Sequence, residues 1–364
     1  MHGKGCVIGF TADLGDKIIP NIVGVDIGCG MLTVELGQID IDLKELDKII
    51  HEVVPSGRNI HEHKLTSMED INNLYCFREL KDTKKFDRAI GTLGGGNHFI
   101  EIDTDEDNNK YLVIHSGSRN MGNQVAKYYQ NLAIQLCSGK EEMFKKKEQI
   151  IKEYKEQGRK DDIQQALKEL SKQYKENKAS LPEDLCYLEG KYRDMYLHDM
   201  DICQRYATLN RTYISSLILD KYFNPDYSMC YSASYFHTIH NYIDIESNIV
   251  RKGATSAKEG ERLLIPINMR DGCIIGVGKG NKDWNCSSPH GAGRLMSRNK
   301  AKETFKLEEF KTSMEGIYTT SVVEETIDEA PFVYKPIQEI IDNIKDTVEI
   351  EKIIKPIYNF KATN

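Results

Sequence analysis

The stretch IIPNIVGVDIGCGMLTVEL, residues 18–36, indicates the fold class of the chain. Apolar and β-branched residues are broken by single glycines, a pattern typical of short buried strands joined by tight turns. Gly28 and Gly30 flank Cys29, and Asp26 lies three residues before it. Such a turn can point a carboxylate and a thiolate at one spot, although this spacing alone favours a buried core cysteine.

Outward from this stretch, strand-like segments alternate with amphipathic helical patterns. Helices are expected at residues 41–54 (with Asp42 as the cap), 120–137, 182–222, about 297–311 and 335–348. Strands are expected within 86–107, in YLVIH (111–115), and between residues 230 and 286. This order predicts an α+β fold with a central mixed β core, in a single domain that spans residues 1–364.

The composition changes between residues 139 and 178, where Lys and Glu dominate and apolar residues are sparse. This pattern predicts a helical insertion within the domain, at about 139–200, with a hairpin broken at Gly158. Dense mixed charge favours a solvated surface over an RNA-binding arm.

The overall composition excludes several classes of protein. The net charge is −7, so nucleic acid binding would need a local basic groove. No apolar run approaches the roughly 18 residues that span a bilayer. The nine cysteines form no CxxC pair, and the N-terminus carries no signal peptide, so we expect reduced thiols and a cytoplasmic location with no membrane association.

The run CSSPHGAGRLMSR (286–298) is the strongest chemical signal in the sequence. Small residues beside His290 would let a polyphosphate approach the imidazole, and Arg294 and Arg298 would bind its oxygens. A neutral imidazole nitrogen is a competent nucleophile toward phosphorus. The alternative is a glycine-rich helix start with a capping histidine.

Other histidines lie beside glycine loops or at strand ends. His98 follows the run GGGN (94–97), and His115 ends the apolar strand YLVIH. His237 and His240 would share one face of a helix, but in a strand they would point to opposite faces, leaving only one for a site. For each histidine alone, a hydrogen-bonded core role is an equal alternative.

Taken together, a carboxylate, a thiolate and several imidazoles form a mixed hard and soft ligand set. This set suits manganese, cobalt or zinc better than magnesium or calcium. Two metals bridged by a thiolate would account for ligands spread over the chain. No GxxxxGK[ST] loop is present, and GVGKGN (276–281) does not complete GxGxxG, which argues against a P-loop NTPase or a dinucleotide fold.

Several longer motifs occur in a fixed order along the chain. They are GKG (3–5), PNIVGVDIGCGM (20–31), GTLGGGNHFIE (91–101), HSGSRNMGN (115–123), HNYIDIE (240–246), RKGATSA (251–257), SSPHGAGRLMSR (287–298) and EAPFVYK (329–335). In these motifs the chain resembles the RtcB family of RNA-splicing ligases. These enzymes join RNA 3′-phosphate or 2′,3′-cyclic phosphate ends to 5′-hydroxyl ends, in RNA repair or tRNA splicing.

The resemblance implies a GTP- and manganese-dependent enzyme, with cobalt or zinc as other possible metals. Cys29 would bridge two metals, with Asp26 and His98 on one and His115 and His240 on the other. His290 would be the catalytic residue that becomes guanylylated. Nucleotide contacts would come from Asn97, Glu101, Asn268, Ala292, Gly293, Tyr334 and Lys361, and contacts to phosphate or RNA from Arg119, Arg294 and Arg298. An archease-like activator is an expected partner besides RNA.

The sequence departs from the family pattern at two places. An Asp-x-His precedes the first glycine loop in the family, whereas here His2 follows Met1 directly. In IPINMRDGC (265–273), Asn268 replaces a serine, and Arg270 replaces a glycine and adds a charge beside the expected pocket. These departures indicate a divergent bacterial-type paralogue, and they keep two alternatives open: a non-catalytic, metal-dependent RNA-end binding protein and a metal-dependent phosphoesterase.

Overall fold

The computed structural model describes residues 6–173, 181–223 and 234–362, so Met1, His2 and the GKG run lie outside it. A ten-stranded sheet forms its centre, in the order β1-β8-β7-β3-β5-β4-β12-β10-β9, with β11 paired to β8. Its strands are β1 (Phe10–Asp13), β3 (Gly30–Gly37), β4 (Phe99–Thr104), β5 (Lys110–Ser116), β7 (Tyr235–Asp244), β8 (Ile249–Ser256), β9 (Arg262–Asn268), β10 (Gly272–Gly278), β11 (Ser287–Pro289) and β12 (Val348–Lys361). A separate pair joins β2 (Lys17–Ile18) to β6 (Leu188–Glu189).

The predicted α+β class is confirmed, but the prediction of a sheet with mixed strand directions is wrong. Every pairing between the described strands is antiparallel. Short connections join β4 to β5, β7 to β8 and β9 to β10, and such connections permit only antiparallel neighbours.

The expected helices are present, with some changes at their ends. The helices are α1 (Pro20–Val23), α2 (Leu43–Val53), α3 (Arg119–Cys137), α4 (Glu141–Glu156), α5 (Ile163–Gln173), α6 (Gly190–Phe223), α8 (Arg298–Thr304), α9 (Leu307–Ser313) and α10 (Ile337–Ile344). Asp42 caps α2 as predicted, accepting from the backbone N–H groups of Lys44 and Glu45. The single helix expected at 297–311 is two helices, because the Glu309 carboxylate accepts from Lys306 N and starts a second one.

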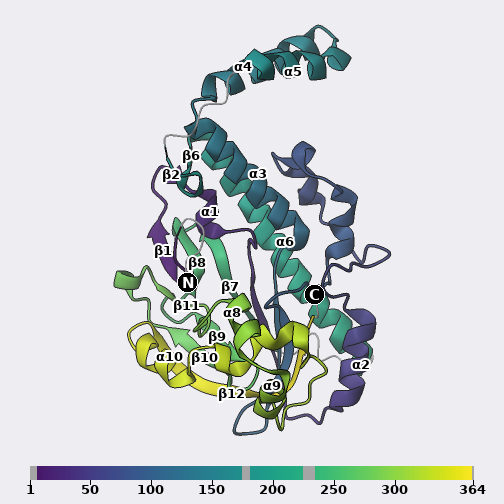
Figure 1. The fold of residues 1–364 in the computed structure, drawn as a ribbon, viewed down its shortest axis with the longest axis vertical. Coiled ribbons are helices and arrows are strands. Elements are labelled where there is room, and N and C mark those ends of the chain that lie inside the picture. Colours follow the sequence, from purple (N-terminus) through teal and green to yellow (C-terminus); the bar gives the residue numbers. More distant parts are fainter. Residues whose placement is uncertain (1–5, 174–180, 224–233, 363–364) are drawn as a thin grey trace.

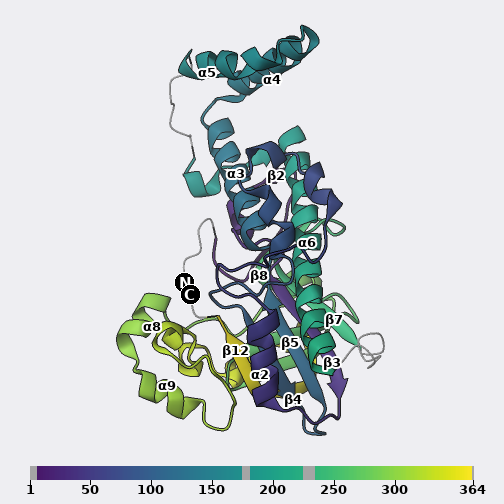
Figure 2. The same cartoon turned by 90° about the vertical axis from the view of Figure 1, so that its right-hand side faces the viewer.

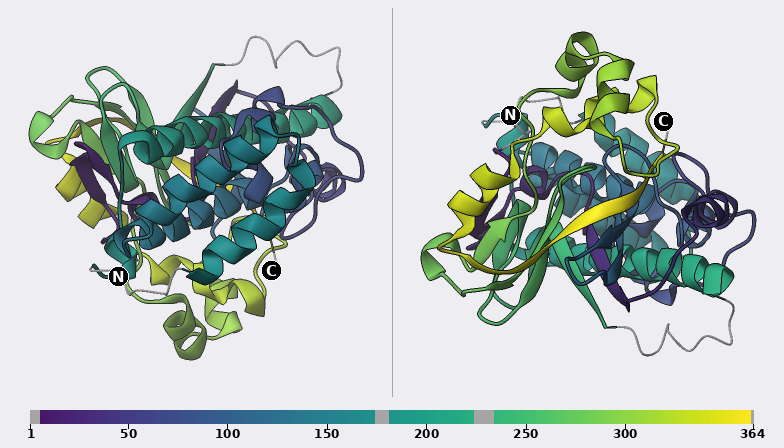
Figure 3. Two further views of the ribbon diagram at one scale, coloured as in Figure 1. Left: turned by 90° about the horizontal axis from the view of Figure 1, so that it is seen from above. Right: turned by 90° about the horizontal axis from the view of Figure 1, so that it is seen from below.

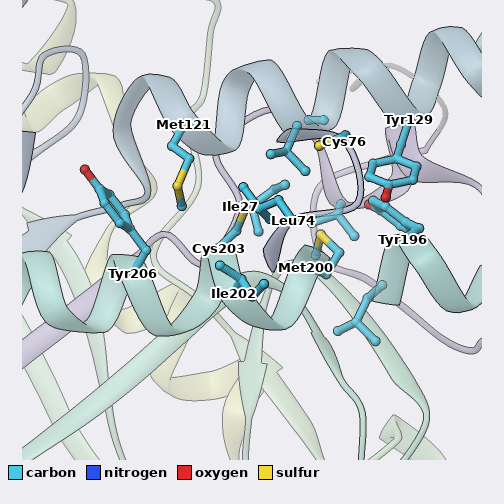
Figure 4. Packing of buried hydrophobic residues seen from close by; sticks show 14 of the residues in the cluster. Ile27, Leu74, Cys76, Met121, Tyr129, Tyr196, Met200, Ile202, Cys203 and Tyr206 are labelled. Atoms are coloured by element: carbon cyan, nitrogen blue, oxygen red, sulfur yellow. The ribbon is translucent and has the colours of Figure 1, made fainter. Parts of the chain in front are cut away.

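The helices α3 and α6 lie side by side over one part of the sheet (Figure 1). Between them, Met121 of α3 lies toward Cys203 of α6, Tyr129 of α3 packs against Tyr196 of α6, and Ile27 packs into the same cluster (Figure 4). Because Ile27 is buried in this cluster, the turn that carries Asp26 and Cys29 on either side of it is held in place.

The sheet is curved, and its far strand β9 returns toward β7. Leu264 N of β9 donates to Thr238 Oγ1 of β7 at 2.9 Å, although these strands are not paired. Met31, Phe99 and Cys273 belong to the cluster that fills the space between the two sides. Figure 3 (right) shows from below the long strand β12, which runs through the sheet between β4 and β10.

Helices α4 and α5 project away from the body of the molecule (Figures 1 and 2). They lie within the insertion expected at 139–200. The later part of that range belongs to the body, because Cys186, Leu188 and Tyr196 are buried in the core cluster beside α3. No helix within the described ranges is long and apolar enough to cross a membrane.

Candidate active site

Asp26 and Cys29 lie in the turn that leads into β3, and glycines make the room they occupy. A Cβ at Gly117 would collide with the Asp26 carboxylate, and a Cβ at Gly30 would collide with the backbone oxygen of Thr238. Cys29 is buried there. Glycine is therefore required at these two positions because any side chain there would clash.

Four of the expected metal ligands meet Cys29 or one another through short contacts. Cys29 Sγ lies 3.4 Å from His98 Nε2 and 3.2 Å from His115 Nε2. His98 Nε2 lies 3.1 Å from Asp26 Oδ2. His115 Nε2 lies 3.3 Å from His240 Nε2, so all five expected ligands form one chain of contacts.

The strand β7 decides which of its two histidines joins this cluster. His237 and His240 both lie in this strand, so an odd separation places them on opposite faces. His240 faces His115, whereas the buried Nδ1 of His237 has no hydrogen-bond partner among the described residues. The helical alternative for this segment is wrong.

The side-chain atoms that meet in this cluster act almost entirely as hydrogen-bond acceptors. His98 Nδ1 donates to Leu93 O at 2.8 Å, and His115 Nδ1 donates to Asn97 O at 3.0 Å. Their Nε2 atoms consequently present lone pairs toward Cys29, an arrangement that could hold a metal ion. Backbone carbonyls that fix the tautomer of ligating histidines in this way are typical of metal sites. Burial also holds the pKa of His115 and His240 well below the ordinary value, so both are neutral, as metal ligation requires.

His290 stands beside this cluster. Its ring centroid lies 4.8 Å from that of His240, and its Nδ1 donates to Gly253 O at 2.6 Å. Burial lowers the pKa of His290, so the imidazole is neutral and Nε2 carries a lone pair. His290 follows β11 and α8 begins only at Arg298, so the alternative of a helix-capping histidine is wrong.

A cavity of about 640 Å³ opens in front of His290, a size typical of small-molecule sites. His115 and His240 reach its wall. The lining also includes all seven residues expected to contact a nucleotide: Asn97, Glu101, Asn268, Ala292, Gly293, Tyr334 and Lys361.

The three expected phosphate-binding arginines differ in position. Arg294 and Arg298 line the cavity. Arg119 is not part of the lining; its Nε donates to Thr92 Oγ1 at 3.0 Å and its NH2 donates to Gly57 O at 2.7 Å. The structure therefore brings two of the three to the cavity and places Arg119 behind the glycine loop.

A family model described as tRNA-splicing ligase RtcB matches residues 1–79 and 63–362. The RNA-splicing ligases RtcB1 and RtcB of two Escherichia coli strains are each 33% identical over 402 residues, which covers 99% of this chain and 88% of each relative. The tRNA-splicing ligase RtcB of Aeropyrum pernix is 26% identical over 429 residues, covering 93% of this chain and 81% of the relative. The chain belongs to the RtcB family. The resemblance in the sequence motifs is thereby confirmed.

Glu329 begins the EAPFVYK motif of this RtcB chain, but the sequence patterns assigned it no role. It is 2% exposed, and its carboxylate accepts from Arg294 at 3.0 Å, Arg298 at 2.7 Å, the Tyr334 hydroxyl at 2.6 Å and Lys361 Nζ at 3.1 Å. Burial alone would raise the pKa of Glu329, but Lys361 and Arg298 outweigh it and hold the pKa at about 2. Glu329 thus orients four side chains that line the cavity.

Two further residues missed from the sequence lie on α6. Asn210 accepts from Thr92 N at 3.0 Å and donates to Gly117 O at 3.1 Å. The buried Arg211 donates to Gly28 O at 2.8 Å. The two residues join the glycine loops of the RtcB site from behind, and the only signal was an adjacent polar pair inside an otherwise core-facing helix.

The departure at IPINMRDGC has a local explanation. Asn268 Oδ1 accepts from the backbone N–H groups of Arg270 and Asp271, at 3.0 and 2.9 Å, and so closes the turn between β9 and β10. Arg270 is exposed, pairs with Asp271 at 2.9 Å and is absent from the cavity lining. The expectation that Arg270 adds a charge to the pocket is wrong, because the Asp271 carboxylate engages its guanidinium.

Proposed function

We propose that this RtcB chain is a GTP- and manganese-dependent RNA ligase that works through a guanylylated His290. The observation that carries the proposal is the neutral imidazole of His290, whose Nδ1 is bound to Gly253 O and which stands between the Cys/His cluster and the cavity. An imidazole held in this tautomer presents Nε2 as the nucleophile.

The Cys/His cluster fits the expected manganese ions. Asp26 and His98 would hold one ion, His115 and His240 the other, and Cys29 would lie between them, in keeping with its contacts to both His98 and His115. Such ions, with cobalt or zinc as alternatives, would offset negative charge on the phosphate oxygens of the reacting groups.

The first step belongs to His290. Its Nε2 attacks the α-phosphorus of GTP, a P–N bond forms, and the bond to the β-phosphate oxygen breaks as pyrophosphate leaves. The positive charge that develops on the imidazole is stabilised by the hydrogen bond from Nδ1 to Gly253 O. The GMP then passes to an RNA 3′-phosphate oxygen, which regenerates His290.

The joining step displaces the GMP. A 5′-hydroxyl attacks the activated 3′-phosphorus, GMP leaves, and a phosphodiester bond results. A 2′,3′-cyclic phosphate end must first be opened by water. Arg294 and Arg298, oriented by Glu329, are placed to bind phosphates of the nucleotide or RNA, while Asn97, Glu101, Asn268, Ala292, Gly293, Tyr334 and Lys361 would contact the nucleotide. Arg119 is proposed to act indirectly, by holding the glycine loop before His98.

RNA is the proposed substrate because the relatives are RNA- and tRNA-splicing ligases. RNA repair and tRNA splicing are both compatible with this proposal. An archease-like activator is a proposed partner.

The test is incubation of the manganese-loaded protein with α-labelled GTP. We expect a covalent, acid-labile label that His290→Ala abolishes. His237→Ala is the matched control, since His237 lies on β7 but outside the cavity lining, and it should retain the label. Absence of label on the metal-loaded wild-type protein would contradict the proposal.

One observation favours a second candidate, a metal-dependent protein that binds RNA ends without joining them. Asn268, which stands where the family has a serine, uses its side-chain oxygen within its own turn instead of toward the cavity. This candidate predicts manganese-dependent binding of RNA 3′-phosphate ends with no GMP transfer. Ligated product from the wild-type chain would exclude it, and product analysis without GTP would reveal a phosphoesterase that only opens cyclic ends.

A further inference from the structure

A second buried polar cluster lies under the wall of the cavity, apart from the Cys/His cluster. Glu101 and Asp103 are two residues apart on β4, so they point to the same face of the sheet. Cys273 of β10 joins them, and one ligand-type atom from each of the three lies within 4.8 Å of the others. Glu101 lines the cavity, whereas Asp103 is 0% exposed beneath it.

Among the described residues, neither carboxyl oxygen of Asp103 has a hydrogen-bond partner of normal geometry, and the Cys273 thiol is the weak donor beside it. The groups around Asp103 on β12 are engaged elsewhere. Asn359 Nδ2 donates to Glu101 Oε1, and its Oδ1 is buried without a partner among the described residues. Lys361 Nζ binds Glu329 at 3.1 Å.

The nearest ionisable groups along β4 do not neutralise Asp103 either. Tyr111 donates to Asp105 Oδ2 at 2.8 Å, and Lys352 Nζ donates to the same oxygen at 3.0 Å. The thiol of Cys273 is the remaining neighbour, and burial raises its pKa, so it stays protonated. Asp103 thus faces a second carboxyl group without a cation of its own.

Two carboxylates buried this close together cannot both ionise. Burial raises the pKa of Asp103 well above the ordinary value, and the neighbouring Glu101 raises it further. Burial also raises the pKa of Glu101 to about 7, with Lys361 and Asn359 opposing the rise. One proton retained between the two carboxyl groups converts an unpaired acceptor into a donor and removes the repulsion.

Resting on the proposed function, we infer that Asp103 is a positioning residue that shares one proton with Glu101 and so holds it toward the bound guanine nucleotide. The proton resides on Asp103, away from the cavity, and the negative charge resides on Glu101, at the cavity wall. Lys361 and Asn359 favour this distribution because both act on Glu101. Glu101 is then an ionised acceptor with one fixed orientation.

The shared proton can be observed without any enzymatic activity. The infrared spectrum of the metal-loaded wild type at neutral pH should show the carbonyl band of a protonated carboxyl group. The difference spectrum between wild type and Asp103→Asn should show that the substitution removes this band. Persistence of all such bands in Asp103→Asn, or their absence from the wild type, would overturn the inference. Metal analysis is the second readout: a bound cation that is lost in Asp103→Asn but retained in Asp199→Asn would also overturn it, because the cluster would then be a metal site.

The positioning role is tested by guanylylation at varied GTP concentration. Asp103→Asn keeps a donor beside Glu101, so its apparent KM for GTP should stay within about twofold of the wild type. Asp103→Leu keeps the branched shape of the side chain but removes the donor, so its apparent KM should rise at least tenfold, about 1.4 kcal/mol, with little change in kcat. Equal KM values for the two variants would contradict the role.

Asp199→Asn is the matched control for the loss of a buried carboxylate. Asp199 lies on α6, accepts from Tyr129 and Cys76, and is outside the cavity lining, so its substitution should lower Tm and leave the KM for GTP unchanged. If the wild type is not guanylylated at all, the proposed function fails, and the infrared and metal measurements still decide whether Asp103 and Glu101 share a proton.

Discussion

Glu329 and Asp103 are two buried carboxyl groups beside the same cavity, yet they have opposite surroundings. Glu329 is 2% exposed and receives four donors, and its pKa is held at about 2. Asp103 is 0% exposed and receives none of normal geometry from the described residues, and its pKa is raised. Burial is nearly the same, so the neighbouring charges decide which group is ionised: cations surround Glu329, whereas a second carboxyl group faces Asp103. The cavity thus has an ionised and a protonated carboxyl group under its wall.

The largest expected effect comes from removing the charge of Glu329. Glu329→Gln removes the charge that orients Arg294, Arg298 and Lys361, and breaking a buried ion pair costs about 3–5 kcal/mol. We expect a large loss of stability and loss of guanylylation, measured by denaturant unfolding and by labelling with GTP. Asp328→Asn is the control: it removes a carboxylate that pairs with Arg298 but leaves Glu329 and its donors in place, so its effect should be smaller.

The acid sensitivity of Glu329 follows from the same contacts. Its pKa of about 2 lies below its ordinary value, so its stabilisation is present above the ordinary pKa and is lost as pH falls toward 2. The shift corresponds to about 3 kcal/mol. Glu329→Gln should therefore lose less stability than the wild type between pH 5 and pH 2, and parallel losses would contradict this assignment.

Lys361 acts on Glu329 and on Glu101, the neighbour of Asp103, so Lys361→Met should weaken the contrast between the two sites. Its Nζ binds Glu329 at 3.1 Å and also lowers the pKa of Glu101. Removing the cation should raise the apparent KM for GTP by about tenfold or more, since a buried charge-assisted hydrogen bond contributes roughly 1.5–3 kcal/mol. Lys335→Met is the control, because that lysine also lines the cavity but pairs with Glu339 near the surface. An equal effect of both substitutions would show that charge near the cavity matters and the specific contact does not.

The sequence brought out the residues that gather at the Cys/His cluster and the cavity better than it brought out the residues that hold them in place. His98, His115 and His290 lie in long motifs, and a motif match depends only on residue order. Glu329 and Asp103 owe their roles to contacts from distant segments, such as Lys361 with Glu329 and Cys273 with Asp103, which no periodicity reveals. The same limit explains Arg270, whose charge was expected in the pocket but is engaged by its neighbour Asp271.

The smallest expected effect is the pH dependence of stability at Asp103. A carboxyl group whose pKa is raised on folding stabilises fully below its ordinary pKa of about 4, and this contribution is lost as pH rises toward the folded value, because only the unfolded chain releases the proton. Asparagine does not titrate, so the Tm of Asp103→Asn relative to the wild type should increase between pH 5 and pH 8, as followed by thermal unfolding. A difference in Tm that is constant over this range would mean that Asp103 is ionised in the folded protein, which would make it resemble Glu329 after all.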